Sequence, residues 1–74
     1  MALPEFGDPL SPSEEEVLAF LLAGESHKTI AKRRNRSQST IDVQVASILI
    51  KTGHANRYKL MAAEIKRLQR GESS

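Results

Sequence analysis

The chain has 74 residues, no cysteine and a formal net charge of +2. Its length suits one small domain with a limited core, which a second subunit would help to bury. The lack of cysteine excludes disulfides and thiolate metal sites and fits a cytoplasmic location. No apolar run reaches the roughly 18 residues of a membrane span, and no basic-then-apolar signal sequence opens the chain. We expect no cofactor, metal, membrane or small-molecule ligand.

The charges are distributed unevenly along the chain. All 11 lysines and arginines lie from Lys28 onward, whereas residues 1–26 carry acids and no cation. One part of the molecule should therefore be electropositive, as binding to phosphate requires. The alternative is a basic face that is merely solvated.

The N-terminal part predicts an arm and a first helix. Residues 1–9, with prolines, a glycine and acids, should form a flexible arm. A helix is expected over residues 12–23, because Ser11 can cap it, Pro12 suits its first position and Glu14 completes a capping box. Gly24 should end it. Its inward stripe would contain Val17, Leu18, Leu21 and Leu22, with Phe20 at the edge.

Residues 26–52 predict two helices joined by a tight turn. Ser26 and Ser37 are good N-caps for helices over 27–34 and 38–52. The turn falls at Asn35–Arg36, because asparagine tolerates left-handed backbone geometry. A helix–turn–helix beside cations is suited to enter a DNA groove. Val43 and Ile50 fall off the inward face of the second helix, which consists of Ile41, Val45, Ile48 and Leu49.

A fourth helix is expected over residues 57–70, after a stop at Gly53, and residues 71–74 should form a flexible tail. This helix has more apolar residues than one narrow stripe needs. Its surplus face, formed by Met61, Ile65 and Leu68, predicts contact with a second copy of the chain. The alternative is one broad stripe that joins a single core.

The order of these residues resembles the DNA-binding domain of the LuxR/GerE/NarL family of bacterial transcription regulators. The similarity runs from Leu10 to about Leu68. It consists of the opening Leu10–Leu18, then Gly24, Ile30–Ala31, Ser37, Thr40 and Ile41, and the ending Lys51, Gly53 and Asn56–Arg57.

The resemblance implies an all-α, four-helix domain over residues 10–70, of the winged-helix-like superfamily. Its third helix would lie in the major groove and its fourth would mediate dimerisation. Such domains usually follow a receiver or a small-signal-binding domain, as output domains in response regulation or quorum sensing. The resemblance assigns base reading to Asp42, Val43 and Ala46, and phosphate contact to Lys28, Thr29, Thr40 and Lys51.

Several residues depart from the family pattern. Asp42 replaces a common Lys or Arg and repels phosphate, but its carboxylate can accept a bond from cytosine N4. Ala46 replaces a basic or polar residue, and Gln44, in place of a frequent His, could pair with adenine if it faces the groove. Arg34 and Arg36 replace apolar residues, and we expect their guanidinium groups to extend toward phosphate or Asp42.

The leading hypothesis is sequence-dependent DNA binding by a homodimer in transcription regulation, with RNA polymerase as a further partner. Four cations would position the protein on phosphates: Lys28, Arg33, Arg36 and Lys51. Four residues would face bases: Ser39, Asp42, Val43 and Gln44. The predicted DNA-binding set comprises these eight residues together with Thr29, Ser37 and Thr40.

Two other functions remain open. Asp42 and Ala46 favour a protein-interaction module of the same fold, which dimerises with a related regulator and reads DNA weakly or not at all. A sigma-factor promoter domain has a similar helix–turn–helix, but the residues from Lys51 to Arg57 and the fourth helix argue against it. We do not expect an enzyme, because His27 and His54 lack cysteine partners and lie in different connectors.

Overall fold

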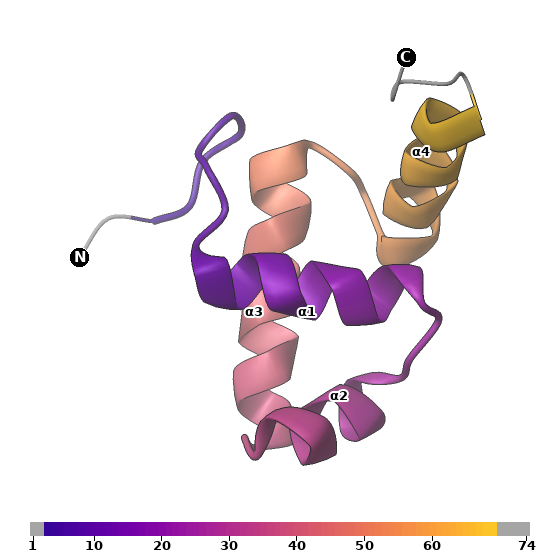
Figure 1. Ribbon diagram of the computed structural model, residues 1–74. Helices are drawn as coiled ribbons and strands as arrows, with labels where there is room; N and C mark the ends of the chain where they lie inside the picture. Colours follow the sequence, from indigo (N-terminus) through magenta and orange to yellow (C-terminus); the bar gives the residue numbers. More distant parts are fainter. Residues whose placement is uncertain (1–2, 70–74) are drawn as a thin grey trace.

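The computed structural model describes residues 3–69, apart from the side chain of Leu68 (Figure 1). Its described part contains the helices α1 (Pro12–Leu22), α2 (His27–Arg34), α3 (Gln38–Thr52) and α4 (Arg57–Gln69), and no strand. The predicted all-α fold is confirmed, with α1 ending one residue earlier than expected. The predicted tail at residues 71–74, and residue 70 at the predicted end of the fourth helix, lie outside the described residues.

Each helix begins at a polar side chain that caps it. The hydroxyl of Ser11 accepts the backbone N–H of Glu14, whose carboxylate accepts the N–H of Ser11, so the predicted capping box is present. The hydroxyls of Ser26 and Ser37 each accept the N–H three residues further on. Asn56 caps α4 in the same way through its side-chain oxygen. Donors that have no partner within the helix are thereby satisfied.

The two helices of the helix–turn–helix end on left-handed residues. Asn35 has φ 56° and ψ 47° after α2, and Gly53 has φ 73° and ψ 27° after α3. In each case the following residue donates its N–H back to a carbonyl five positions earlier, from Arg36 to Ala31 at 2.9 Å in the first. This geometry closes the helix and reverses the chain. Both predicted helix ends are confirmed.

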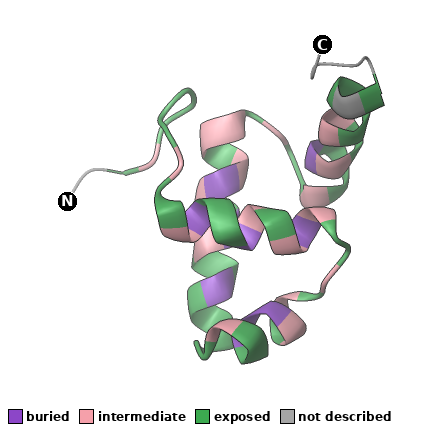
Figure 2. Ribbon diagram, in the orientation of Figure 1, coloured by how far each residue is buried: buried purple, intermediate pink, exposed green. Residues whose placement is uncertain are grey.

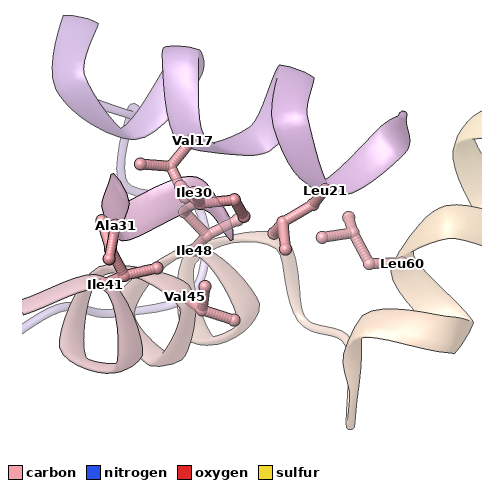
Figure 3. Packing of buried hydrophobic residues seen from close by; sticks show 8 residues of the cluster. All are labelled: Val17, Leu21, Ile30, Ala31, Ile41, Val45, Ile48 and Leu60. Atoms are coloured by element: carbon pink, nitrogen blue, oxygen red, sulfur yellow. The ribbon is translucent and has the colours of Figure 1, made fainter. Parts of the chain in front are cut away.

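The core lies where α3 packs against the three other helices (Figures 1 and 2). α1 crosses α3, α2 lies beside the N-terminal part of α3, and α4 lies to the side of the C-terminal half of α3, where it also contacts α1. The predicted stripe on α3 faces inward, while Val43 and Ile50 are exposed. Figure 3 shows the buried cluster, which consists of Val17, Leu21, Ile30, Ala31, Ile41, Val45, Ile48 and Leu60.

Glu14 is a buried carboxylate that joins α1 to α3. Its Oε1 accepts from the Nζ of Lys51 at 2.7 Å and from the N–H of Ser11 at 2.9 Å, and its Oε2 accepts from the hydroxyl of Ser47 at 2.6 Å. Burial raises the pKa of Glu14, but the hydrogen bonds from these three residues and the charge of Lys51 outweigh burial and lower the pKa from 4.5 to about 2. The folded protein therefore favours the ionised form.

The N-terminal segment contacts the C-terminal end of α3. The N–H of Gly7 donates to the carbonyl of Lys51 at 2.9 Å. The ring of Phe6 lies over Gly53, where a Cβ would come within 2.6 Å of the ring. A side chain at position 53 would therefore meet both a left-handed backbone and the aromatic ring.

Glu14→Gln should destabilise the protein at neutral pH by roughly 3 kcal/mol, which corresponds to the depressed pKa. A carboxylate with a lowered folded-state pKa stabilises the fold above its unfolded pKa, and this contribution is lost as the pH falls. The difference in the free energy of unfolding between wild type and Glu14→Gln should therefore disappear as the pH falls from about 4.5 to about 2. Urea unfolding at several pH values measures it.

Glu15→Gln is the matched control, because Glu15 is an exposed acid in the same turn of α1. It should change the free energy of unfolding by less than about 0.5 kcal/mol at every pH. Equal effects of the two substitutions would show that Glu14 does not hold α1 to α3.

Candidate nucleic-acid interface

One face of α3 points away from the core. Ser39, Val43 and Ala46 lie opposite the buried stripe, since successive residues turn by about 100° around a helix. All three are exposed, and the side chain of Val43 keeps 69% of its surface accessible. Asp42 is exposed beside them. These short side chains would let another molecule approach the helix backbone closely, and we call them the outward face of α3.

Gln44 does not belong to this outward face. It is half-buried, and its Oε1 is buried with no hydrogen-bond partner. The helical period places it on the flank of α3 that carries Ser47 and Lys51, which bind Glu14 of α1. The structure thus does not bring Gln44 together with the other residues predicted to face bases.

Three exposed cations lie on α2 and in the turn that joins it to α3: Lys28, Arg33 and Arg36. Arg33 lies 3.9 Å from the carboxylate of Glu25, and this contact costs little to break because it is long and the Arg33 side chain is largely exposed. Within residues 3–69, neither Lys28 nor Arg36 forms an ion pair. Their charges are therefore available to a polyanion.

Hydroxyl groups occur at the beginnings of α2 and α3. Thr29 Oγ1 accepts from Ser26 Oγ at 3.0 Å, and the hydroxyls of Ser37 and Thr40 lie 2.9 Å apart. Ser37 and Thr40 are exposed, and Thr29 is half-buried. These hydroxyls lie at helix N-termini, where backbone N–H groups and the helix dipole favour anions.

Lys51 has a partner inside the protein. Its Nζ contacts the buried carboxylate of Glu14, and only 16% of its side chain is accessible. Moving this ammonium group to a phosphate would leave Glu14 buried without its counter-charge, which is unfavourable. The structure therefore gives Lys51 a role in holding α1 to α3.

The expectation for Arg34 was wrong. Its guanidinium group turns to α1, where it donates to Glu16 Oε1 at 2.9 Å and to Ser13 Oγ at 3.0 Å, and its side chain is only 13% accessible. An arginine at an apolar position needs partners when it is buried, and α1 supplies them. Arg36 is exposed, as expected, but neither arginine pairs with Asp42.

The partner of Asp42 is His27. Asp42 Oδ1 lies 2.7 Å from Nδ1 of His27, which is the first residue of α2. No local pattern indicates this pair, because the two residues are 15 positions apart in the chain. The missed contacts between Glu14, Ser47 and Lys51 also join residues that are distant in the sequence.

The outer face of α4 carries two of the residues predicted for dimerisation. Ile65 is 50% exposed and Met61 is half-buried, while Leu60 fills the core on the opposite side (Figure 3). Tyr58 is also exposed close to Ile65, since residues seven positions apart share a helix face. The side chain of Leu68, the third predicted residue, lies outside the described residues.

Residues 3–69 form no pocket and gather no group of three metal-ligating side chains. Within the same range, no helix combines the length and apolar character needed to cross a membrane.

Residues 8–63 match the model of a protein family described as bacterial regulatory proteins, luxR family. The chain belongs to this family. The matched segment includes α1, the helix–turn–helix and the first half of α4. Membership makes the chain a helix–turn–helix DNA-binding domain of a transcription regulator. Searches among curated proteins and among solved structures found no match.

Proposed function

We propose that the domain binds double-stranded DNA sequence-dependently, with α3 in the major groove. The observation that carries this proposal is the exposed outward face of α3, together with Lys28 and Arg36 on α2 and the turn, which are exposed and form no ion pair within residues 3–69. An α-helix fits the major groove, where base edges present distinct patterns of donors and acceptors. Ser39 can exchange hydrogen bonds with a base, and Val43 can contact the methyl group of thymine.

Phosphate contacts in this arrangement come from Lys28, Arg33 and Arg36. Hydroxyls and backbone N–H groups at the starts of α2 and α3 add neutral donors, from Thr29, Ser37 and Thr40. Contacts of this kind fix the orientation of the protein and give most of the salt-dependent affinity. We leave Lys51 and Gln44 out of the proposed interface, because Glu14 binds the former and the protein body partly buries the latter.

The proposed active form is a homodimer joined through the outer face of α4. Ile65 and Met61 support this, because an exposed apolar face on a small domain gains from burial against a second copy. A dimer would present two copies of α3 to two half-sites. As a cytoplasmic regulator it would also meet RNA polymerase, which is a proposed partner on the grounds of this role alone.

The second candidate is an interaction module that dimerises with a related regulator and reads DNA weakly. The carboxylate of Asp42 beside the outward face favours it, because a negative charge there opposes phosphate. Sedimentation combined with gel retardation separates the two functions. Dimers that fail to retard any duplex support the interaction module, and salt-dependent retardation supports DNA reading.

Arg36→Ala should weaken DNA binding without unfolding the domain. Removal of one phosphate contact should make the slope of log affinity against log salt concentration shallower by about 0.9. Because Arg36 is exposed and forms no ion pair within residues 3–69, the free energy of unfolding should change by less than about 0.5 kcal/mol. Fluorescence anisotropy with a duplex at several salt concentrations gives the slope.

Arg34→Ala is the matched control two residues away. It removes the bonds to Glu16 and Ser13, so it should cost roughly 1–2 kcal/mol of stability and leave the salt slope unchanged. If Arg34 rather than Arg36 alters the slope, the cations that meet phosphate have been assigned incorrectly.

Ile65→Glu should weaken self-association, because it places a charge in the proposed apolar contact. We expect the dimer dissociation constant, measured by sedimentation equilibrium without DNA, to rise at least about tenfold. Lys66→Glu introduces the same side chain about 100° around the helix and should leave association nearly unchanged. A monomeric wild type, or equal effects of both variants, would contradict the assignment of α4.

A further inference from the structure

The pair formed by His27 and Asp42 joins the beginnings of α2 and α3. The distance between Nδ1 and Oδ1 is 2.7 Å, and a carboxylate can only accept a hydrogen bond. Nδ1 must therefore carry the proton, whichever form the other ring nitrogen takes. Because both side chains reach the surface, this bond adds little to stability.

In this bond only Oδ1 of the Asp42 carboxylate is used, so Oδ2 can still accept a hydrogen bond. Within residues 3–69, Oδ2 of Asp42 makes no hydrogen bond and no ion pair. Asp42 also lies directly before Val43, at the edge of the outward face of α3. A lone carboxylate beside a groove would be repelled by phosphate, but it can accept from the exocyclic amino group of cytosine.

We propose that His27 is a positioning residue for base reading, which holds one oxygen of Asp42 so that the other is presented to a cytosine amino group in the major groove. This inference rests on the proposed function and names the base that Asp42 recognises. An acceptor that is fixed before binding loses less conformational freedom on contact, and it discriminates more sharply because it cannot rotate toward another donor.

The chain offers closely matched variants for a test. His27→Asn keeps an N–H donor on the atom bonded to Cγ, where Nδ1 stands in histidine. His27→Gln moves the donor one bond farther from the backbone, and His27→Leu removes it at similar volume. Asp42→Asn replaces an acceptor-only group by an amide that also donates.

The experiment begins with selection of duplexes by wild-type protein from a random library. Competition binding then compares cytosine with the other three bases at each selected position. We expect wild type to prefer cytosine by about tenfold at one position in each half-site, the magnitude of one good base contact. His27→Asn should retain this preference. His27→Leu, His27→Gln and Asp42→Asn should reduce it below about threefold, while the two His27 variants keep salt-dependent binding to unrelated duplexes.

A merely structural role for His27 predicts another pattern. Thermal melting reports whether each variant is folded. If the contact only holds α2 against α3, its loss would lower the melting temperature and would lower the affinity for every duplex alike. Full cytosine preference in folded His27→Leu or His27→Gln overturns the inference, as does DNA binding by wild type with no cytosine preference. Absence of any DNA binding by wild type overturns the proposed function itself, so the two failures are distinguishable.

Discussion

The burial of one stripe of α3 determines how the rest of the surface is arranged. Ile41, Val45 and Ile48 are the residues through which α3 joins the core, and α1, α2 and α4 all pack around this helix. Once that stripe is inside, the helical period leaves Ser39 and Val43 outside. The domain therefore presents a helix that is anchored along one side and open to solvent along the other.

Polar contacts then fix α3 against its neighbours on both flanks. On one flank Ser47 and Lys51 bind the buried carboxylate of Glu14 in α1, and on the other Asp42 binds His27 in α2. The two contacts have different consequences. Breaking the buried contact of Glu14 with Lys51 would cost much stability, and this contact keeps the lysine away from the surface. The exposed contact of Asp42 with His27 holds one carboxylate oxygen and contributes little stability.

The parts of this structure that depend on neighbouring residues could be predicted from the sequence. Serine caps, the left-handed Asn35 and the inward stripe of α3 are local features, and they set the helices and their faces. The contacts of Arg34 and Lys51 could not be predicted, because each joins residues that are far apart in the chain and requires the relative placement of two helices. For the same reason, the sequence predicts a phosphate contact for Lys51, whereas in the folded protein its ammonium group binds the carboxylate of Glu14.

Amide chemical-shift mapping by NMR, with a selected duplex added in steps, tests most directly whether the open side of α3 meets DNA. The largest shifts should fall on residues 37–46 of α3 and on Lys28 and Arg36 beside it, and they should diminish as salt is raised. The exposed side of α1, at Glu15 and Ala19, should remain unaffected. Shifts confined to α4, or absent from residues 37–46, would contradict DNA reading by α3.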